Sequence, residues 1–204
     1  AIIARIDKSG AMVAVEKQLD IERESPLNIT LVQAVCASEK MDWIMQKAVE
    51  LGVSRIQPIT TSRSVVRLSG ERADKRMRHW QQIVTSACEQ CGRNHLPQVL
   101  PLLSLPEWLG GQMTGRKNSR DGAPGNLCFM LSPTAEKGLR DFPGVATVAA
   151  LTLLVGPEGG FAPEEEAAAR ATGFVPLRLG GRILRTETAA LAAVAALQAL
   201  WGDC

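Results

Sequence analysis

Two glycine-rich turns in the sequence lie beside charged side chains that could take part in catalysis. The first is the Gly-Pro-Glu-Gly-Gly sequence of residues 156–160, which follows the apolar run 153–155 and precedes Pro163 and three glutamates. Glycines at the carboxyl end of a strand let a ligand approach the backbone closely. The segment lacks the Gly-Lys-Ser/Thr signature of a phosphate loop, and its glutamates would repel phosphate. The pattern indicates either a ligand-binding loop or a simple tight turn between a strand and a helix.

The second turn, Gly-Gly at residues 180–181, has the same strand, turn and helix pattern. Arg182, Arg185 and Glu187 are crowded around it, and Thr186 is suited to cap the helix that follows. Arg185 and Glu187 could serve catalysis, or they could form an ion pair that only completes the start of the helix.

A third strand end breaks into a loop at residues 131–134, Leu-Ser-Pro-Thr. Three such loops, rich in Gly and Pro, describe a crevice site at one edge of an α/β sheet. A nonpolar lining with backbone donors suits an uncharged flat ring such as adenine better than a polyphosphate.

The elements that position these loops follow from the hydrophobic periodicity. Strands are expected at 29–35, 53–59, 127–131, 148–155 and 174–179, and helices at 41–51, 71–91, from 163 and at 187–201. Strands that alternate with helices indicate a parallel sheet flanked by helices, so the fold class is α/β. We expect the polar, Gly-rich residues 110–126 to form a surface loop.

The two ends of the chain have distinct patterns. Residues 1–24 read as two short alternating strands and a polar hinge, which is typical of the tail end of a small β-domain. The last helix is apolar nearly all round, so we expect it to be buried in the core or against another chain.

Composition excludes several classes of protein. The chain has 204 residues, with 23 Lys and Arg against 21 Asp and Glu, which rules out a histone-like polycation. Four Trp, four Phe and no Tyr are few for a protein that stacks many bases of a single strand. The last helix is shorter than the roughly 20 apolar residues that a bilayer span needs.

The cysteines and the first residues bear on compartment and metal binding. Five cysteines, an odd number, and a charged amino-terminal segment without signal-peptide character predict a cytoplasmic protein with reduced thiols. The pair Cys88 and Cys91 has the spacing of a metal or redox motif but lacks a second pair, and structural zinc needs four ligands. We expect core cysteines and no metal.

A basic segment precedes and enters the second helix. Six basic residues lie between residues 63 and 78 against Glu71 and Asp74, and Arg93 follows. Such a run is usually a solvated helix face, but it can also form a track for an RNA backbone. The predicted RNA contacts are Arg63, Arg67, Arg72, Lys75, Arg76 and Arg93.

The paired carboxyl-terminal motifs resemble those of the RsmE family, bacterial methyltransferases of the SPOUT superfamily that make 3-methyluridine in 16S ribosomal RNA. The matching segments include Gly156-Pro157-Glu158-Gly159-Gly160-Phe161, Leu179-Gly180, Ile183-Leu184-Arg185-Thr186-Glu187-Thr188-Ala189, residues 40–52, Arg63-Ser64-Val65-Val66 and Glu89-Gln90-Cys91-Gly92-Arg93. The resemblance covers about residues 25–204.

The resemblance implies a fold and a partner beyond the pattern itself. It implies that residues 25–204 form a SPOUT domain with a carboxyl-terminal trefoil knot, an exception to the rule that protein folds are unknotted. It further implies a homodimer acting on 16S rRNA of the small ribosomal subunit, with residues 1–24 as the remnant of a PUA-like RNA-binding β-barrel. S-adenosylmethionine would lie in the knot against Leu131, Ser132, Val155, Gly156, Gly160, Leu179, Gly180, Ile183 and Leu184.

The chemistry of such a reaction assigns roles to charged residues. Methyl transfer from a sulfonium is an in-line displacement, so positioning contributes most. Uracil N3 is a poor nucleophile until its proton leaves. An arginine can stabilise the developing anion and a carboxylate can accept the proton. We expect Arg185 in the first role and Glu187 or Glu158 in the second, although each glutamate could instead only stabilise a helix amino terminus.

Two other functions fit the same sequence. A related knotted methyltransferase could act on another base or on tRNA, and a catalytically silent RNA-binding protein could use the glycine loops as turns only.

Overall fold

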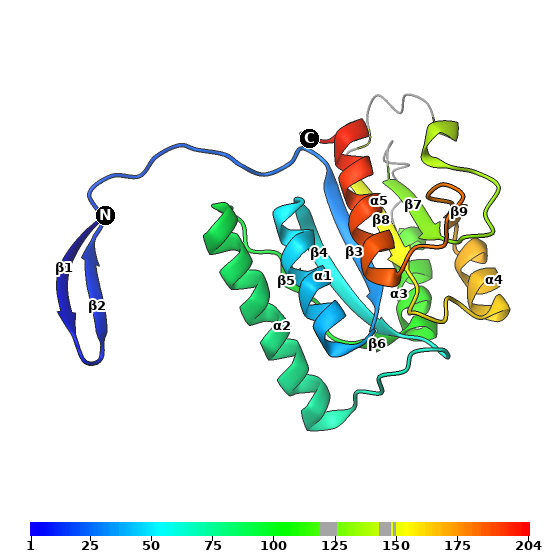
Figure 1. Cartoon of the computed structure of the whole chain (residues 1–204), viewed down its shortest axis with the longest axis horizontal. Helices are drawn as coiled ribbons and strands as arrows, with labels where there is room; N and C mark the ends of the chain where they lie inside the picture. The colour runs from blue at the N-terminus through cyan, green and yellow to red at the C-terminus, as the bar shows by residue number, and fades with distance from the viewer. Residues whose placement is uncertain (119–125, 143–147, 149) are drawn as a thin grey trace.

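The computed structural model describes residues 1–118, 126–142, 148 and 150–204 (Figure 1). An antiparallel hairpin comes first, with strands β1 (Ile2–Asp7) and β2 (Gly10–Ala14). The other strands are β3 (Asn28–Ala34), β4 (Val53–Thr60), β5 (Gln98–Val99), β6 (Leu103–Ser104), β7 (Asn126–Leu131), β8 (Ala150–Val155) and β9 (Val175–Leu177). The helices are α1 (Ser38–Glu50), α2 (Gly70–Cys91), α3 (Leu105–Asn118), α4 (Pro163–Ala171) and α5 (Thr186–Trp201), with a 3₁₀ turn at Leu139–Asp141.

A parallel sheet forms the centre of the molecule. Its seven strands follow the order β5-β4-β3-β8-β7-β9, and β6 pairs with the end of β4. On one side β3 pairs with β4. On its other side β3 pairs with β8, β8 with β7, and β7 with β9. This confirms the α/β class, and it brings the carboxyl ends of β8, β7 and β9 side by side.

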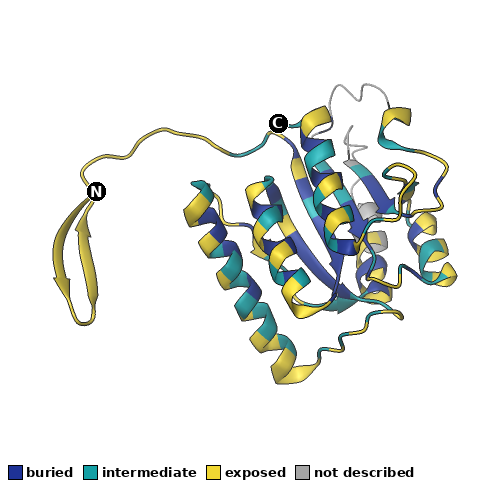
Figure 2. Cartoon of the chain, viewed as in Figure 1, coloured by how far each residue is buried: buried dark blue, intermediate teal, exposed yellow. Residues whose placement is uncertain are grey.

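Each face of the sheet is covered by helices because alternate side chains of the strands point to opposite faces. Ile29 and Leu31 of β3 join a core with α1, α2 and α5, whereas Val32 and Ala34 join a second core with α3 and α4. Figure 2 shows the strands buried between these layers. The continuous apolar runs of the sequence are therefore strands buried on both faces.

The helix α3 was not expected from the sequence. Residues 110–118, predicted as part of a surface loop, continue the helix that begins at Leu105. Leu105, Trp108 and Leu109 are buried, and the Trp108 ring lies 5.7 Å from that of Phe174. Tertiary packing of these side chains outweighs the low helix propensity of the two glycines at 110 and 111. Residues 119–125 of the predicted loop lie outside the described residues.

The last helix is only half buried. Ala190, Ala193, Val194 and Leu197 face the core, whereas Leu200 remains 52% exposed. One face of α5 therefore packs in the core as expected, and burial of its other face against another chain stays a prediction. None of the helices in the described ranges is both long and apolar enough to cross a membrane.

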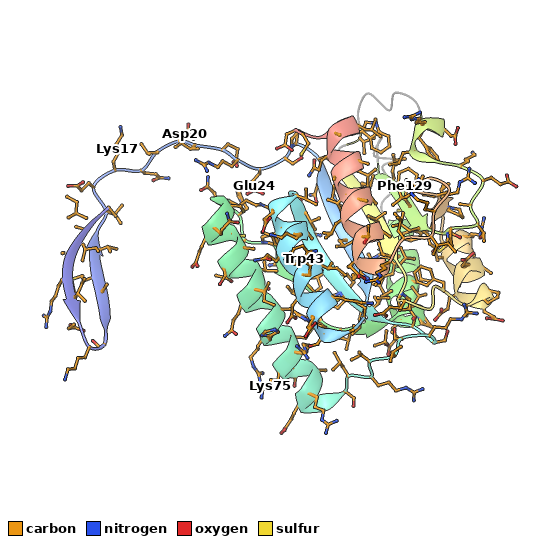
Figure 3. The ribbon with its side chains drawn as sticks, in the orientation of Figure 1. Lys17, Asp20, Glu24, Trp43, Lys75 and Phe129 are labelled. Atoms are coloured by element: carbon orange, nitrogen blue, oxygen red, sulfur yellow. The ribbon has the colours of Figure 1, made fainter. Side chains whose placement is uncertain are left out.

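The amino-terminal hairpin stands apart from the sheet domain (Figures 1 and 2). All of residues 1–23 are exposed. Contact with the domain begins at Ile21, whose carbonyl accepts a hydrogen bond from Asn94. It continues at Glu24, which pairs with Arg93, and at Ser25, whose hydroxyl lies 2.7 Å from Oε1 of Gln198. Figure 3 labels Glu24 where the extended segment reaches the domain.

Candidate functional site

A cavity of about 670 Å³ opens at the carboxyl ends of β7, β8 and β9. This volume is in the range of sites for small molecules and cofactors. Eight of the nine residues predicted to hold a cofactor line it: Leu131, Ser132, Val155, Gly156, Gly160, Leu179, Ile183 and Leu184. Gly180 is next to the cavity in sequence but does not line it. The three loops singled out in the sequence thus meet at one place.

The turn after β8 depends on close approach to two glycines. A Cβ atom on Gly156 would come within 3.2 Å of the Phe161 ring, and one on Gly159 within 3.3 Å of the Arg63 side chain. Phe161 is buried and lines the cavity. A side chain at either glycine would require the neighbouring Phe161 or Arg63 side chain to shift, so the glycines serve packing as well as the turn.

Arg63 supports this turn from a neighbouring loop. Its Nη1 donates to the carbonyl oxygens of Gly159 at 3.0 Å and Phe161 at 3.1 Å. The backbone N–H of Ser62 donates to Glu165 at 2.7 Å. Arg63 was predicted to contact RNA, but in the structure its guanidinium bonds the turn that lines the cavity.

The hydroxyl of Thr186 joins two of the cavity loops. Its Oγ1 donates to the carbonyl of Gly156 at 2.6 Å and accepts a hydrogen bond from Nε2 of Gln33 at 3.1 Å. The predicted cap role is wrong, because Arg185 occupies the N-cap position and makes no side-chain cap bond. Thr186 instead lies in the first turn of α5, where its side chain fixes the end of β8 against the start of α5.

The two candidate glutamates lie at the amino-terminal end of α1. Glu158 Oε1 accepts from the backbone N–H of Ala37 at 3.2 Å and from Lys40 Nζ at 3.1 Å. Partial burial raises the pKa of Glu158, but hydrogen bonds from backbone N–H groups and from Lys40 outweigh it and hold that pKa below its usual value. Glu187 Oε2 lies 3.8 Å from Lys40 Nζ and is buried without a hydrogen bond from any described residue.

Arginines lie along the other part of the rim. Arg178, Arg182 and Arg185 are exposed and line the cavity. Within the described part of the chain, Arg185 does not pair with Glu187, so the ion pair considered from the sequence is absent there. The guanidinium of Arg185 is therefore available to a ligand.

The predicted RNA contacts fall into two groups. Arg67, Arg72 and Lys75 are exposed before and along the first turns of α2, and Figure 3 shows Lys75 projecting from that helix. Arg76 is half buried, 3.9 Å from Asp42.

Arg93 differs from the rest of this set. Its side chain is 6% exposed, and its nitrogens donate to Glu24 and to the carbonyls of Val49 and Val53. Because this guanidinium is buried and each of its three nitrogens already donates to the protein, it is not placed to bind a phosphate, so we remove Arg93 from the predicted RNA surface.

The cysteines fit structural positions. Cys36 and Cys88 are buried, Cys91 is half buried, and all five cysteines are free thiols. Burial, with the charges of Glu158 and Glu187, raises the pKa of Cys36 to about 12, so this thiol stays protonated at neutral pH. Among the described residues, no group of His, Cys, Asp or Glu side chains could hold a metal ion.

Two polar residues of the site, Lys40 and Gln33, were not among the site residues predicted from the sequence. Lys40 lines the cavity, and Gln33 is completely buried at the end of β3. Neither lies in a glycine turn, and their partners are more than 100 residues away in the sequence. The signal for Lys40 was its place in the segment 40–52 that carries the family resemblance.

Comparisons with known proteins agree with this site. Residues 23–198 match the family model of the RNA methyltransferase domain. The chain is 37% identical over 193 residues to the ribosomal RNA small subunit methyltransferase E of Buchnera aphidicola subsp. Schizaphis graminum, which covers 94% of this chain and 73% of that protein.

Solved structures extend the comparison to three dimensions. Ribosomal RNA small subunit methyltransferase E from Neisseria gonorrhoeae, bound to S-adenosylmethionine, is 45% identical with a TM-score of 0.75, covering 89% of this chain and 69% of that one. A putative methyltransferase from Legionella pneumophila in complex with the same cofactor is 39% identical with a TM-score of 0.87, covering 99% and 78%. The chain belongs to the RNA methyltransferase domain family and, within it, to the ribosomal RNA small subunit methyltransferases E, the RsmE family.

Proposed function

We propose that the chain uses S-adenosylmethionine to methylate N3 of a uridine in 16S rRNA of the small ribosomal subunit. One observation carries the proposal. The three loops at the carboxyl ends of β7, β8 and β9 meet around one cavity, with Arg185 and Glu158 in its lining and Glu187 beside it. The relatives named as small-subunit rRNA methyltransferases, one of them bound to S-adenosylmethionine, support the substrate class and the cofactor.

The cavity fits this cofactor in chemistry as well as in volume. Leu131, Val155, Leu179 and Leu184 offer an apolar lining for a flat ring, and backbone groups of the loops are close because glycines form the turns. We expect these residues, with Ser132, Gly156, Gly160, Ile183 and more marginally Gly180, to hold the cofactor. When bound, the cofactor supplies a methyl group on a positively charged sulfur.

The residues of this chain then prepare the nucleophile. The proton on uridine N3 must leave, and the negative charge that develops spreads over the adjacent carbonyl oxygens. Arg185, with a free guanidinium on the rim, can stabilise that charge. An uncharged base in a pocket also explains why the chain needs few aromatic residues for stacking.

The two glutamates are not equivalent as proton acceptors. Glu158 accepts hydrogen bonds from Lys40 and from Ala37, and its lowered pKa makes it a weak base. Glu187 has a buried oxygen that accepts no hydrogen bond from the described residues. We therefore assign proton acceptance to Glu187 and a supporting role to Glu158.

The topology supports the trefoil knot that the family resemblance implies. The chain leaves β9 at the outer edge of the sheet, passes the cavity with residues 178–185, and enters α5, which packs against β8 and α1. To reach α5 it must cross back over the ends of β7 and β8. We propose that this return threads the loop after β8 and thereby makes the cofactor site.

Two surfaces suit the proposed partners. The exposed side of α5, with Ala192, Ala199 and Leu200, permits close approach of a second copy, which supports a homodimer. Arg67, Arg72 and Lys75 offer positive charge to an RNA backbone, with Arg76 at its edge. We further propose that residues 1–24 belong to a PUA-like β-domain that assists RNA binding, and that the protein acts in the cytoplasm, where ribosomes are assembled.

Two measurements test the function. Calorimetry should detect binding of S-adenosylmethionine, and the absence of binding at millimolar cofactor would favour a silent RNA-binding protein. Mass-spectrometric mapping of rRNA from cells lacking the protein should reveal one missing 3-methyluridine in 16S rRNA. A missing modification on another base or in tRNA would contradict the proposed substrate and favour a related methyltransferase.

A further inference from the structure

Four titratable side chains from distant parts of the chain converge at the amino-terminal end of α1. Cys36 follows β3, Lys40 lies in the first turn of α1, Glu158 lies in the turn after β8, and Glu187 lies in the first turn of α5. Lys40 Nζ is 3.1 Å from Glu158 Oε1 and 3.8 Å from Glu187 Oε2. The Cys36 thiol is protonated at neutral pH, so the cluster contains two carboxylates and one cation.

The single cation is shared unequally between the carboxylates. Lys40 makes its hydrogen bond to Glu158, which also accepts from the Ala37 backbone. At 3.8 Å the ammonium is too far from Glu187 for a hydrogen bond but close enough for a strong electrostatic attraction. Glu187 is therefore attracted by the positive charge of Lys40, while its Oε2 accepts no hydrogen bond from the described residues.

We propose that Lys40 is a positioning residue for methyl transfer, holding Glu158 in place through a hydrogen bond and placing a positive charge beside the carboxylate of Glu187. This inference rests on the proposed function, because it assumes that Glu187 accepts the proton of uridine N3. In that step the N–H bond breaks, its electron pair stays on N3, and the proton forms an O–H bond on the Glu187 carboxylate.

The physical reason is the attraction between opposite charges in a partly buried place. Without Lys40, the two carboxylates that lie 3.1 and 3.8 Å from its ammonium would lose the attraction that favours their charged forms. Protonation of the acceptor before the substrate arrives would then be easier, and increasingly so as the pH falls. The carboxylates also act on Lys40. Its hydrogen bond to Glu158 raises the pKa of the ammonium, which therefore stays charged.

The experiment compares pH profiles of methyl transfer for Lys40→Met, Lys40→Arg and a control. Lys47 is the matched control, because it lies on the same helix, is equally exposed at 30% against 31%, and pairs with Glu50 at 2.8 Å away from the cavity. Turnover on 30S subunits that lack the modification is measured between pH 5 and 9 at saturating cofactor and RNA.

We expect Lys40→Met to move the acidic limb upward by about one pH unit or more, as for loss of an opposite charge within 4–6 Å. On the acidic side of both limbs, turnover of Lys40→Met should then be about 10-fold lower than that of the wild type, and the difference should shrink to nothing toward pH 9. Lys40→Arg should restore most of the profile, and Lys47→Met should match the wild type. Cofactor affinity of Lys47→Met should equal that of the wild type, and saturating cofactor keeps any change in the affinity of the Lys40 variants out of the profiles.

Three results would overturn the inference. They are a Lys40→Met profile equal to that of Lys47→Met, a loss of turnover that is uniform across pH, or a loss explained by weaker RNA binding alone. If Lys40→Met does not fold, Lys40→Gln takes its place with the same expectations. The wild type serves as a separate test, because its failure to methylate 30S subunits would reject the proposed function, whereas an unshifted variant profile beside an active wild type rejects only the role of Lys40.

Discussion

The two ends of α1 each carry a cluster of charged side chains, and the clusters differ in how their polar atoms are satisfied. At the carboxyl end, Arg93 donates to Glu24 and to the carbonyls of Val49 and Val53, so all three of its nitrogens are occupied. At the amino end, Lys40 lies between two carboxylates, and one oxygen of Glu187 accepts no hydrogen bond from the described residues.

This difference in hydrogen bonding distinguishes charged side chains that stabilise the fold from charged side chains that are available to a substrate. A buried pair whose bonds are all made resists change, because removing one partner leaves the other charged and unpaired. A buried acceptor left open costs stability unless a ligand or a water molecule fills it, and a catalytic role is one reason for a protein to keep such an atom. The satisfied cluster, Arg93 with Glu24, contributes no residue to the lining of the cavity. The open cluster, Lys40 with Glu158 and Glu187, lies beside the cavity.

The largest effect is expected for Glu187→Gln. The amide cannot accept a proton, so turnover should fall at least about 100-fold, which is the lower range for general base catalysis. The free energy of unfolding should stay close to that of the wild type. Transfer of labelled methyl groups to 30S subunits and urea unfolding measure the two quantities. Glu158→Gln is the control, and a larger loss of turnover there than in Glu187→Gln would reverse the assignment of the acceptor.

The opposite pattern is expected for Arg93→Met. It leaves Glu24 and two backbone carbonyls without their partner, so the free energy of unfolding should fall by about 3 kcal/mol. Turnover per folded molecule at low temperature should stay near the wild-type value. Lys47→Met, which breaks an exposed pair on the same helix, should cost less than about 0.5 kcal/mol. If Arg93→Met lowered the free energy of unfolding by less than about 1 kcal/mol and also abolished turnover, the proposed difference between the two clusters would be wrong.

The bond between the two cavity loops should have an intermediate effect. Thr186→Val keeps the shape of the side chain but removes the bonds to Gly156 and Gln33, at a cost of about 1–3 kcal/mol. Because Gly156 lines the cavity, affinity for S-adenosylmethionine in calorimetry should fall about 10-fold. Thr186→Ser retains the hydroxyl and should bind nearly normally. Equal affinity of the valine and serine variants would show that the bond does not shape the cofactor site.

Much of this architecture could be predicted from periodicity and turn chemistry. Continuous apolar runs predicted the buried strands, and glycines after residues 155 and 179 marked two of the loops that line the cavity. Those signals are local, because a strand is defined by a few neighbouring residues. The helix α3 was missed because its buried face, with Trp108, is completed only by contact with Phe174.

The partners of charged residues could not be predicted in the same way. Arg63 and Arg93 belong to a basic pattern that suggested RNA contacts, yet each donates to backbone carbonyls of another segment. Lys40 and Glu158 are separated by 118 residues, and only the sheet order brings them together. Residue type and spacing indicate that a charge needs a partner, but the fold decides whether that partner is a protein or a substrate.

The smallest effect concerns the acid stability of the satisfied cluster. Burial raises the pKa of Glu24, but the hydrogen bonds and charge of Arg93 outweigh it, so its pKa in the folded protein is below the usual value. A carboxyl with a lowered folded-state pKa stabilises the fold fully above its unfolded pKa and loses that contribution as pH falls through the folded pKa. Glu24→Gln should therefore be less stable than the wild type at pH 6, and the difference should narrow as the pH falls toward 3. Urea unfolding at each pH measures it, and Glu22→Gln, an exposed neighbour, should show no such narrowing. If the difference in the free energy of unfolding between Glu24→Gln and the wild type did not change with pH, Glu24 would contribute through packing rather than through its charge. The comparison of the two clusters could then no longer rest on the charge of Glu24.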